Sequence, residues 1–540
     1  MKRSFTLLVA MVIFLSACAT PAASTSAPTE QVGPAPTSQP VEVVPVESTA
    51  TTVLIPEATT TPTPVPPSSH WYWAVDLDTA KIIAVNQLGE RREIGALDPS
   101  ENENASYLSI DNERALLFLD SNNNLRLYLL TPDGMQKIAL PSDPFYFNAE
   151  SWQPSRAILA TYEDHVLFSY VTDGSSNIMP DRAPILLVDL KALTARLIDE
   201  SVSRGSYSDS RAWIHASADG RILRYLNGDQ AKMDIRELDM LTGEARTLFT
   251  TTGSSYYIYA SPQGDTWYLS NANLIQNIDG NQKDLADESL TFRPLKDGKG
   301  IVYPLDCVDD CEIKLISPFA NEAELTYHFP WTIEFGTFYG EVGQWLPDQS
   351  LLLAGKPFAN FSNPPAAAEA YPDLTGNDSP LFRLTPDGQA RLVGIYTGNV
   401  SDDGRYILLR SSNQTSFFVY DAVADRPLFD MPVDPALEGF LPTVKFLDTG
   451  ILVNLTASVV GDKNAYRSFY YVYSYKTSTA MTWEDVNLEY SGCPDLLEDG
   501  SVVCWLYRMD TFNFDLVRYD PVTETKTTLL ENVWLIDFTP

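Results

Sequence analysis

The chain has 540 residues, with 71 Asp or Glu against 37 Lys or Arg, and its formal net charge is −34 at pH 7. A surface this acidic repels phosphate backbones and anionic lipid head groups, so the charge argues against nucleic-acid binding and against membrane docking through basic residues. Because 44% of the residues are apolar and 11% are aromatic, the chain can fill a large core, which excludes disorder for most of its length. The acidity is compatible with cationic partners or divalent ions, and equally with a role in keeping an exported protein soluble.

Residues 1–17 are predicted to be a lipoprotein signal peptide. The chain starts with the basic tripeptide Met1-Lys2-Arg3, and the apolar run Phe5–Leu15 is too short to span a bilayer as a permanent helix. The run ends in Leu15-Ser16-Ala17-Cys18, which resembles a bacterial lipobox. The resemblance implies that Cys18 is lipidated and becomes the first residue, at the extracytoplasmic face of a cell membrane or an outer membrane. The alternative is an ordinary signal peptide with an incidental cysteine.

Residues 18–69 are predicted to be the lipidated Cys18 followed by a disordered stalk. From Ala19 to Ser69 the chain contains no Lys, Arg or aromatic residue and consists mainly of Pro, Thr, Ser, Ala and Val. Such a segment has nothing with which to form a core. We therefore expect an extended tether that holds the rest of the chain away from the membrane and reaches about 160 Å when fully extended.

From Trp71 onward, short strand-like runs alternate with turns rich in Asp, Gly, Asn and Pro, and no segment sustains a helical period, so the predicted class is all-β. The clearest unit contains the turn Ser217-Ala218-Asp219-Gly220-Arg221, the strand Ile222–Leu226 and a second turn, Asp239-Met240-Leu241-Thr242-Gly243. Related turns begin at Ile110, Trp152, Ser261, Leu295, Leu346, Ser401, Leu447 and Leu497. Their mean spacing of about 48 residues is the size of a propeller blade.

These two turns resemble the repeat of TolB-type and peptidase-type β-propellers, in which Ser-Pro-Asp-Gly-Lys/Arg precedes an alternating strand and an Asp-Leu-x-Thr-Gly turn. The resemblance covers residues 70–540 at the level of the repeat and implies a single closed β-propeller of four-stranded blades. Nine units and one split unit are present in the sequence, and we expect about eight blades, within a range of seven to ten. The unit Trp71–Gly95 lacks a first strand, which Val533–Phe538 from the C-terminus would supply to close the ring.

Four cysteines follow Cys18, an even number that favours disulfides in an exported chain. Cys307 and Cys311 flank a short turn, and Cys493 and Cys504 stand on either side of the Asp499-Gly500 turn. Local pairing of 307 with 311 and of 493 with 504 fits hairpin geometry. A metal site is the alternative, but no His cluster accompanies either pair, so no metal or other cofactor is expected.

The motifs of common hydrolases are missing from the sequence. Neither Gly-x-Ser-x-Gly nor His-Glu-x-x-His occurs, and the four histidines are far apart in the sequence. Hydrolysis of a glycosidic bond needs only two carboxylates, but the 71 acidic residues do not single out a pair. The sequence therefore singles out no catalytic residue.

A ligand-binding face is predicted where second-to-third-strand loops and connections between blades emerge together. Long loops at Thr172–Pro184, Lys356–Pro380 and Val459–Tyr466 fall there. Aromatic residues at the connections suit flat sugar faces or peptide side chains: Phe145, Tyr146, Tyr256, Tyr257, Trp331, Phe335, Phe338 and Tyr339. The alternative is that these rings begin the innermost strands and pack between blades.

Two functions fit these observations. The first is a lipid-anchored, monomeric propeller outside the cytoplasm that binds a protein, peptide or glycan without catalysis and touches the membrane only through its anchor. The second is an envelope hydrolase of glycosidase type that uses a carboxylate pair in the central channel.

Overall fold

The computed structural model describes residues 70–534 with gaps. The longer gaps span 98–104, 147–153, 173–181, 204–213, 253–257, 332–342, 358–364 and 486–489. The predicted signal peptide, the predicted lipidation site Cys18 and the predicted stalk lie outside the described residues, as do Tyr256, Tyr257, Phe335, Phe338 and Tyr339. No helix within the described ranges is long and apolar enough to cross a membrane.

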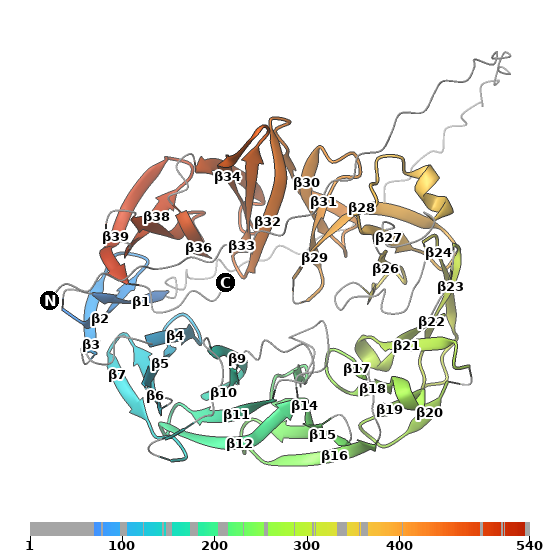
Figure 1. Cartoon of the computed structure of the whole chain (residues 1–540), viewed down its shortest axis with the longest axis horizontal. Helices are drawn as coiled ribbons and strands as arrows, with labels where there is room; N and C mark the ends of the chain where they lie inside the picture. Colours follow the sequence, from blue (N-terminus) through green and yellow to red (C-terminus); the bar gives the residue numbers. More distant parts are fainter. Residues whose placement is uncertain are drawn as a thin grey trace, which may run out of the picture. The chain divides into compact units, whose positions relative to one another are not determined.

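The described strands form ten antiparallel modules, which follow one another in chain order in Figure 1. Module 1 contains β1 (Trp71–Asp76), β2 (Lys81–Asn86) and β3 (Arg91–Ala96). Module 2 contains β4 (Ala105–Ser109), β5 (Ala115–Ser121), β6 (Asn124–Thr131) and β7 (Gly134–Ile138), with β8 (Phe145–Tyr146) paired to β6. Module 3 contains β9 (Pro154–Tyr162), β10 (His165–Thr172), β11 (Arg182–Asp189) and β12 (Thr194–Ser203).

The middle of the chain continues this pattern. Module 4 contains β13 (Ile214–Ala216), β14 (Ile222–Asp229), β15 (Lys232–Asp239) and β16 (Ala245–Thr252). Module 5 contains β17 (Ile258–Ala260), β18 (Thr266–Leu269), β19 (Leu274–Asn277) and β20 (Gln282–Asp284). Module 6 contains β21 (Leu290–Pro294), β22 (Gly300–Pro304), β23 (Cys311–Ile316) and β24 (Leu325–Phe329). Short 3-10 helices η1 (Ser270–Ala272), η2 (Lys296–Gly298) and η4 (Ala366–Ala370) lie between strands.

The last four modules complete the domain. Module 7 contains β25 (Gly343–Trp345), β26 (Leu351–Ala354), β27 (Pro380–Leu384) and β28 (Ala390–Val400), and module 8 contains β29 (Tyr406–Arg410), β30 (Ser416–Asp421) and β31 (Arg426–Pro432). Module 9 contains β32 (Leu437–Leu447), β33 (Gly450–Val459), β34 (Asp462–Ser474) and β35 (Thr479–Asp485). Module 10 contains β36 (Tyr490–Leu496), β37 (Val502–Arg508), β38 (Asn513–Asp520) and β39 (Thr525–Trp534).

Hydrophobic clusters fill the space between successive modules. Each of the ten clusters found among the described residues draws its side chains from two neighbouring modules, and one of them joins module 10 to module 1. Strand β1 shows how: Trp71, Trp73 and Val75 enter the cluster with module 2, whereas Tyr72 and Ala74 enter the cluster with module 10. Because alternate residues of a strand point to opposite faces, a strand buried on both faces is apolar throughout.

The β-propeller predicted from the repeat is therefore confirmed, with ten modules at the upper limit of the expected range. The expected value of about eight blades was too low, because weak copies of the turn also form complete sheets. The copy Ser261-Pro262-Gln263-Gly264-Asp265, for example, joins β17 to β18.

The two ends of the domain meet in a pair of strands. Trp534 and Val533 at the end of β39 pair with Val75 and Asp76 of β1, as predicted for the C-terminal strand. Figure 1 shows the red strand β39 beside the blue strand β1. Strand β39 begins earlier than expected and also pairs with β38, so it serves both modules. Residues 535–538 of the predicted strand lie outside the described residues.

The recurring turn is held by one set of hydrogen bonds. Ser217 Oγ donates to Asp219 Oδ1 over 2.6 Å, and the Ile222 amide donates back to Ser217 Oγ over 2.9 Å. Arg221 then donates to Asp239 of the second turn, with Nη2 2.6 Å from Oδ2. The same bonds recur around Ser401, Asp403, Arg405 and Asp421 in module 8. The motif thus ties the two turns of one module together.

Both predicted disulfides are present. Cys307 is bonded to Cys311 and Cys493 to Cys504. The second bond links β36 to β37 and is buried in the cluster between modules 9 and 10.

Candidate functional site

The two ends of the strands carry different kinds of connection. One end, the turn end, carries the tight turns between first and second and between third and fourth strands. Contacts between modules brace it: Arg114 binds Asp164 across modules 2 and 3, and Arg224 donates to the Gln263 carbonyl across modules 4 and 5. The other end, the loop end, carries second-to-third-strand connections and crossings between modules. Several of these connections fall in the ranges that the structure does not describe.

Three of the predicted aromatic residues lie within the described part. Phe145 and Tyr146 form β8, which pairs with Leu125 and Asn124 of β6. Trp331 is fully buried in the cluster between modules 6 and 7, with its ring centroid 5.9 Å from that of Phe382. Trp331 thus packs between modules, the alternative stated for these rings, and does not present its ring at the surface.

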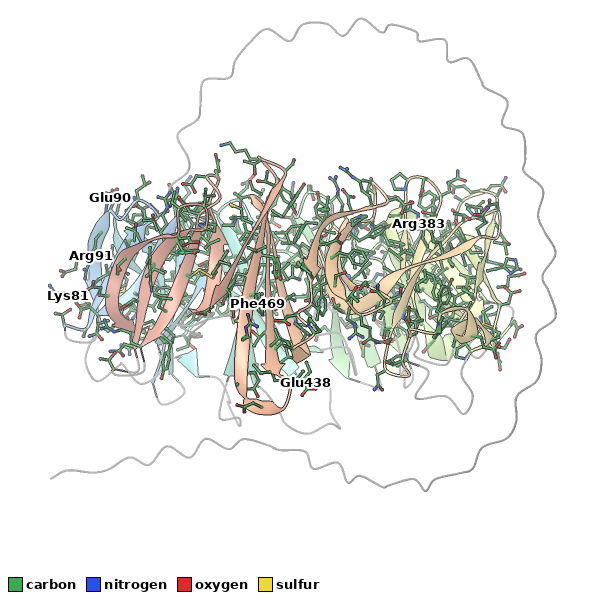
Figure 2. The ribbon with its side chains drawn as sticks, turned by 90° about the horizontal axis from the view of Figure 1, so that it is seen from above. Lys81, Glu90, Arg91, Arg383, Glu438 and Phe469 are labelled. Carbon is green, nitrogen blue, oxygen red and sulfur yellow. A yellow bond between two sulfur atoms is a disulfide. The ribbon has the colours of Figure 1, made fainter. Side chains whose placement is uncertain are left out.

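Module 9 differs from its neighbours at the loop end. Its strands β32, β33 and β34 have 11, 10 and 13 residues, whereas β29, β30 and β31 of module 8 have 5, 6 and 7 and β36, β37 and β38 of module 10 have 7, 7 and 8. Figure 2 shows the strand end that carries Glu438 projecting beyond the neighbouring strands. The predicted loop Val459–Tyr466 is instead a tight turn: Val459 pairs with Asp462, and Gly461 has a φ of +83°. This conformation costs least at glycine, so the hairpin can extend this far.

This extension exposes apolar side chains. Leu441, Val460 and Tyr466 have exposed fractions of 68%, 54% and 47%. Ser458 pairs with Tyr466, and Thr456 pairs with Leu441, so Leu441 and Tyr466 stand on the same face of the sheet two residues apart along β33. We call residues 438–441, 456–460 and 462–467 the module 9 tip.

The other exposed large apolar residues of the described part are isolated. Leu88, Leu241, Val423 and Val522 each stand in a hairpin turn of a different module. Single exposed apolar residues are normal on a soluble surface, whereas a group on one sheet face marks a binding surface. The module 9 tip is therefore the strongest candidate for a docking site among the described residues.

Polar groups lie beside these apolar side chains on the same face. Ser468 Oγ donates to Asn454 Oδ1 over 2.7 Å and lies 3.1 Å from Thr456 Oγ1. Ser458 Oγ donates to the Glu438 carbonyl over 3.0 Å. These bonds fix the side chains of the sheet in place, so the surface is preorganised for binding.

An ion-pair network supports the tip from the opposite face. Arg467 Nε lies 2.5 Å from Glu484 Oε1, and its Nη1 lies 2.9 Å from Asp434 Oδ2. The hydrogen bond from Arg467 lowers the pKa of Glu484. The guanidinium also lies over the Phe469 ring, 5.0 Å from its centroid. With its charge balanced by two carboxylates, Arg467 holds β34 to β35 and does not make the tip cationic.

A concave feature lies at the loop end of module 6. A cavity of about 240 Å³ is lined by Leu290, Val302, Pro304, Glu312 and Lys314. Glu312 and Lys314 form a 3.2 Å ion pair, and about half of each side chain is exposed. The two charges satisfy each other at the surface, so this cavity offers a weaker site than the module 9 tip.

A cluster of titratable groups joins modules 10 and 1. Asp495 accepts a hydrogen bond from the Tyr72 hydroxyl over 2.8 Å and lies 3.0 Å from His70 Nδ1. Burial, together with the Asp495 carboxylate, raises the pKa of Tyr72 well above its usual value. Burial lowers the pKa of Lys445 on β32, with Asp495 acting in the opposite direction. His70 directly precedes β1, so the cluster fastens the first strand of module 1 to module 10.

Groups suited to catalysis are scattered. His70, His165, His215 and His328 belong to modules 1, 3, 4 and 6, and no group of three or more metal-ligating side chains is found within the described ranges. Among the buried carboxylates, Asp421 is paired with Arg405 and Asp378 with Arg410. Pairing of this kind gives these carboxylates a structural role.

No protein-family model matches the chain, and no curated protein matches it. Solved structures do. The β-propeller domain of the Trilobed protease from Pyrococcus furiosus is 13% identical over 70% of this chain and 98% of its own, with a TM-score of 0.30. An oligogalacturonate lyase in complex with manganese is 13% identical over 76% and 97%, with a TM-score of 0.30. A putative TolB from Agrobacterium tumefaciens is 18% identical over 48% and 91%, with a TM-score of 0.21. The assignment of the fold rests on the strand pairing and the module interfaces described above.

Proposed function

We propose that this chain is a lipid-anchored β-propeller that works outside the cytoplasm as a monomeric, non-catalytic scaffold and binds a protein, peptide or glycan. The proposal combines the lipobox at Cys18 and the stalk of residues 18–69 with a rigid domain of ten modules. A tether of this composition lets the domain sample a volume around its anchor, which favours capture of partners over fixed assembly.

The observation that carries the proposal is the module 9 tip. Its apolar side chains are exposed on a sheet face whose backbone and polar groups are already ordered. Soluble proteins rarely expose a group of large apolar side chains on one surface, and such a group marks a surface that a partner covers in the complex.

The anchor is tested with the full chain expressed in a bacterium. The wild-type chain should remain with the membrane fraction and incorporate labelled palmitate, and Cys18→Ala should do neither because it lacks the acylated thiol. Membrane retention and labelling of Cys18→Ala would contradict the lipid anchor.

The binding role is tested with the full chain purified in detergent. It is incubated separately with peptidoglycan fragments, neutral oligosaccharides and synthetic peptides, and both retention and chemical change of each probe are measured. Retention of a probe without turnover supports a scaffold. Turnover of any probe would contradict it and favour hydrolysis by a carboxylate pair.

A further inference from the structure

The module 9 tip combines apolar exposure with negative charge. Glu438 and Asp462 are exposed beside Leu441, Val460 and Tyr466. The tip itself contains two acids, Glu438 and Asp462, and two bases, Lys463 and Arg467. Arg467 is paired with Glu484 and Asp434, which lie outside the tip, so the tip together with these two carboxylates has four acids against two bases. The whole chain has the same sign, with a net charge of −34.

From this we infer the chemistry of the partner: the module 9 tip binds a protein segment that presents apolar side chains next to Lys or Arg. The inference rests on the proposed binding function and narrows it to one class of partner. Apolar side chains of the segment cover Leu441 and Tyr466, while its cationic groups meet Glu438 and Asp462. Two aliphatic side chains and one ring suit a polypeptide better than the flat face of a sugar.

Charge complementarity has a kinetic consequence. An acidic surface attracts a cationic segment over a distance set by the ionic strength, so the association rate should fall as salt is added. Apolar contacts at the tip then slow dissociation, which salt affects little. Both contributions are needed, because a net charge of −34 alone attracts any cation without selecting among them.

Three ten-residue peptides separate these contributions. The first contains three Leu and three Lys among Gly and Ser, the second has Ser in place of Leu, and the third has Glu in place of Lys. Binding to the full chain in detergent is measured by fluorescence anisotropy at low and at high salt. We expect the Leu/Lys peptide to bind at least tenfold more tightly than either of the others, and high salt to weaken it through the association rate.

Variants locate the site. The double variant Leu441→Gln/Tyr466→Gln should remove the tenfold advantage of the Leu/Lys peptide over the Ser/Lys peptide. The matched control is Leu88→Gln/Val522→Gln, which removes two exposed apolar side chains from turns of other modules and should leave that advantage intact. Circular dichroism of each variant checks that the β-structure is unchanged. The inference is supported if the tip variant loses the advantage of the Leu/Lys peptide over the Ser/Lys peptide and the control variant keeps it.

Other results overturn it. Equal binding of the Leu/Lys and Ser/Lys peptides to the wild-type chain would show attraction by charge alone, and an advantage that survives in the tip variant would place the contact elsewhere. If neutral oligosaccharides are retained without turnover while no peptide binds, the scaffold function stands and the polypeptide partner is wrong. If the Leu/Lys peptide binds at the tip and is cleaved, the scaffold function fails and the location of the site stands.

Discussion

At the scale of single residues, an Arg–Asp pair joins the second and third strands in several modules, but the two charges exchange places. In modules 4 and 8 the arginine follows the recurring turn and the aspartate ends the third strand, if the second half of β28 is counted as the first strand of module 8: Arg221 is paired with Asp239 of β15, and Arg405 with Asp421 of β30. In modules 7 and 10 the aspartate lies in the turn and the arginine on the third strand: Asp348 with Arg383, and Asp499 with Arg518. Repeats without the Asp-Gly-Arg triplet can therefore keep an Arg–Asp ion pair between the same two strands.

Asp348 makes stability depend on pH in the acid range. Burial raises the pKa of its carboxyl, but hydrogen bonds from Ser350 and Arg383 outweigh that effect and hold it at about 2. The pair stabilises the fold above the unfolded-state pKa of about 4, and this contribution is lost as the pH falls toward 2. Asp348→Asn should lower the free energy of unfolding at pH 7 by no more than about 1 kcal/mol, because the carboxylate is more than half exposed.

The measurement is urea unfolding at pH 7 and at pH 2.5. The difference between wild type and Asp348→Asn should shrink at the lower pH. Asp448→Asn, which removes an exposed carboxylate, controls for the change in net charge. A difference that is the same at both pH values would contradict the role given to Asp348.

At the scale of strands and turns, the disulfides act on hairpins of different lengths. Cys493 and Cys504 are 11 residues apart and join β36 to β37, whereas Cys307 and Cys311 are four residues apart. In the chain-entropy account, a longer closed loop constrains the unfolded chain more strongly.

Replacing Cys493 and Cys504 together by Ala should therefore lower the free energy of unfolding by about 2 to 4 kcal/mol. Replacing Cys307 and Cys311 together should cost less, because the loop removed is shorter. Denaturant unfolding of both double variants, with and without reductant, compares the two losses. A larger loss from the short pair would show that local packing outweighs loop length.

The strands and turns were largely predictable from the sequence, and the site was not. The turn at Ser217 and the alternating strand after it predicted the repeat and the all-β class. The missing first strand of the unit Trp71–Gly95 predicted the pairing of the chain ends. The sequence offered nine units and one split unit, the copy at Ser261 among them, and the range of seven to ten includes the ten modules observed. The preferred value of about eight was lower because propellers typically have four to eight blades. The tip was missed because Val459–Tyr466 contains Gly and Asp, which favour a loop. Only the pairing of Val459 with Asp462 shows that the strands continue to the turn.

At the scale of the whole molecule, the contact between modules 10 and 1 joins the two ends of the domain. It combines the pairing of β39 with β1, a hydrophobic cluster that contains Val533, and the contacts of Asp495 with Tyr72 and His70. The residues involved are more than 400 positions apart in the sequence, so forming this interface costs the loop-closure entropy of that separation unless the modules between have already folded.

Val533→Asp tests this interface. Val533 is buried and pairs with Asp76, so an aspartate there places a second carboxylate beside the first in an apolar cluster. The free energy of unfolding should fall by about 3 kcal/mol. Val522→Asp is the control, since Val522 is 72% exposed in the preceding turn and should lose little. Equal unfolding midpoints in urea for the two variants would show that the meeting of the ends adds no stability.

Strands that belong to two modules set the size of the units that open together. β28 pairs with β27 along its first half and with β29 along its second half. β39 likewise pairs with β38 and with β1. β12 pairs with β14 at one position, Val202 with Asn227. Releasing β28 would free amides on both of its partners. Modules 7 and 8 should therefore exchange their amide hydrogens as one cooperative block, whereas modules 5, 6 and 9, each a separate sheet, should open one at a time.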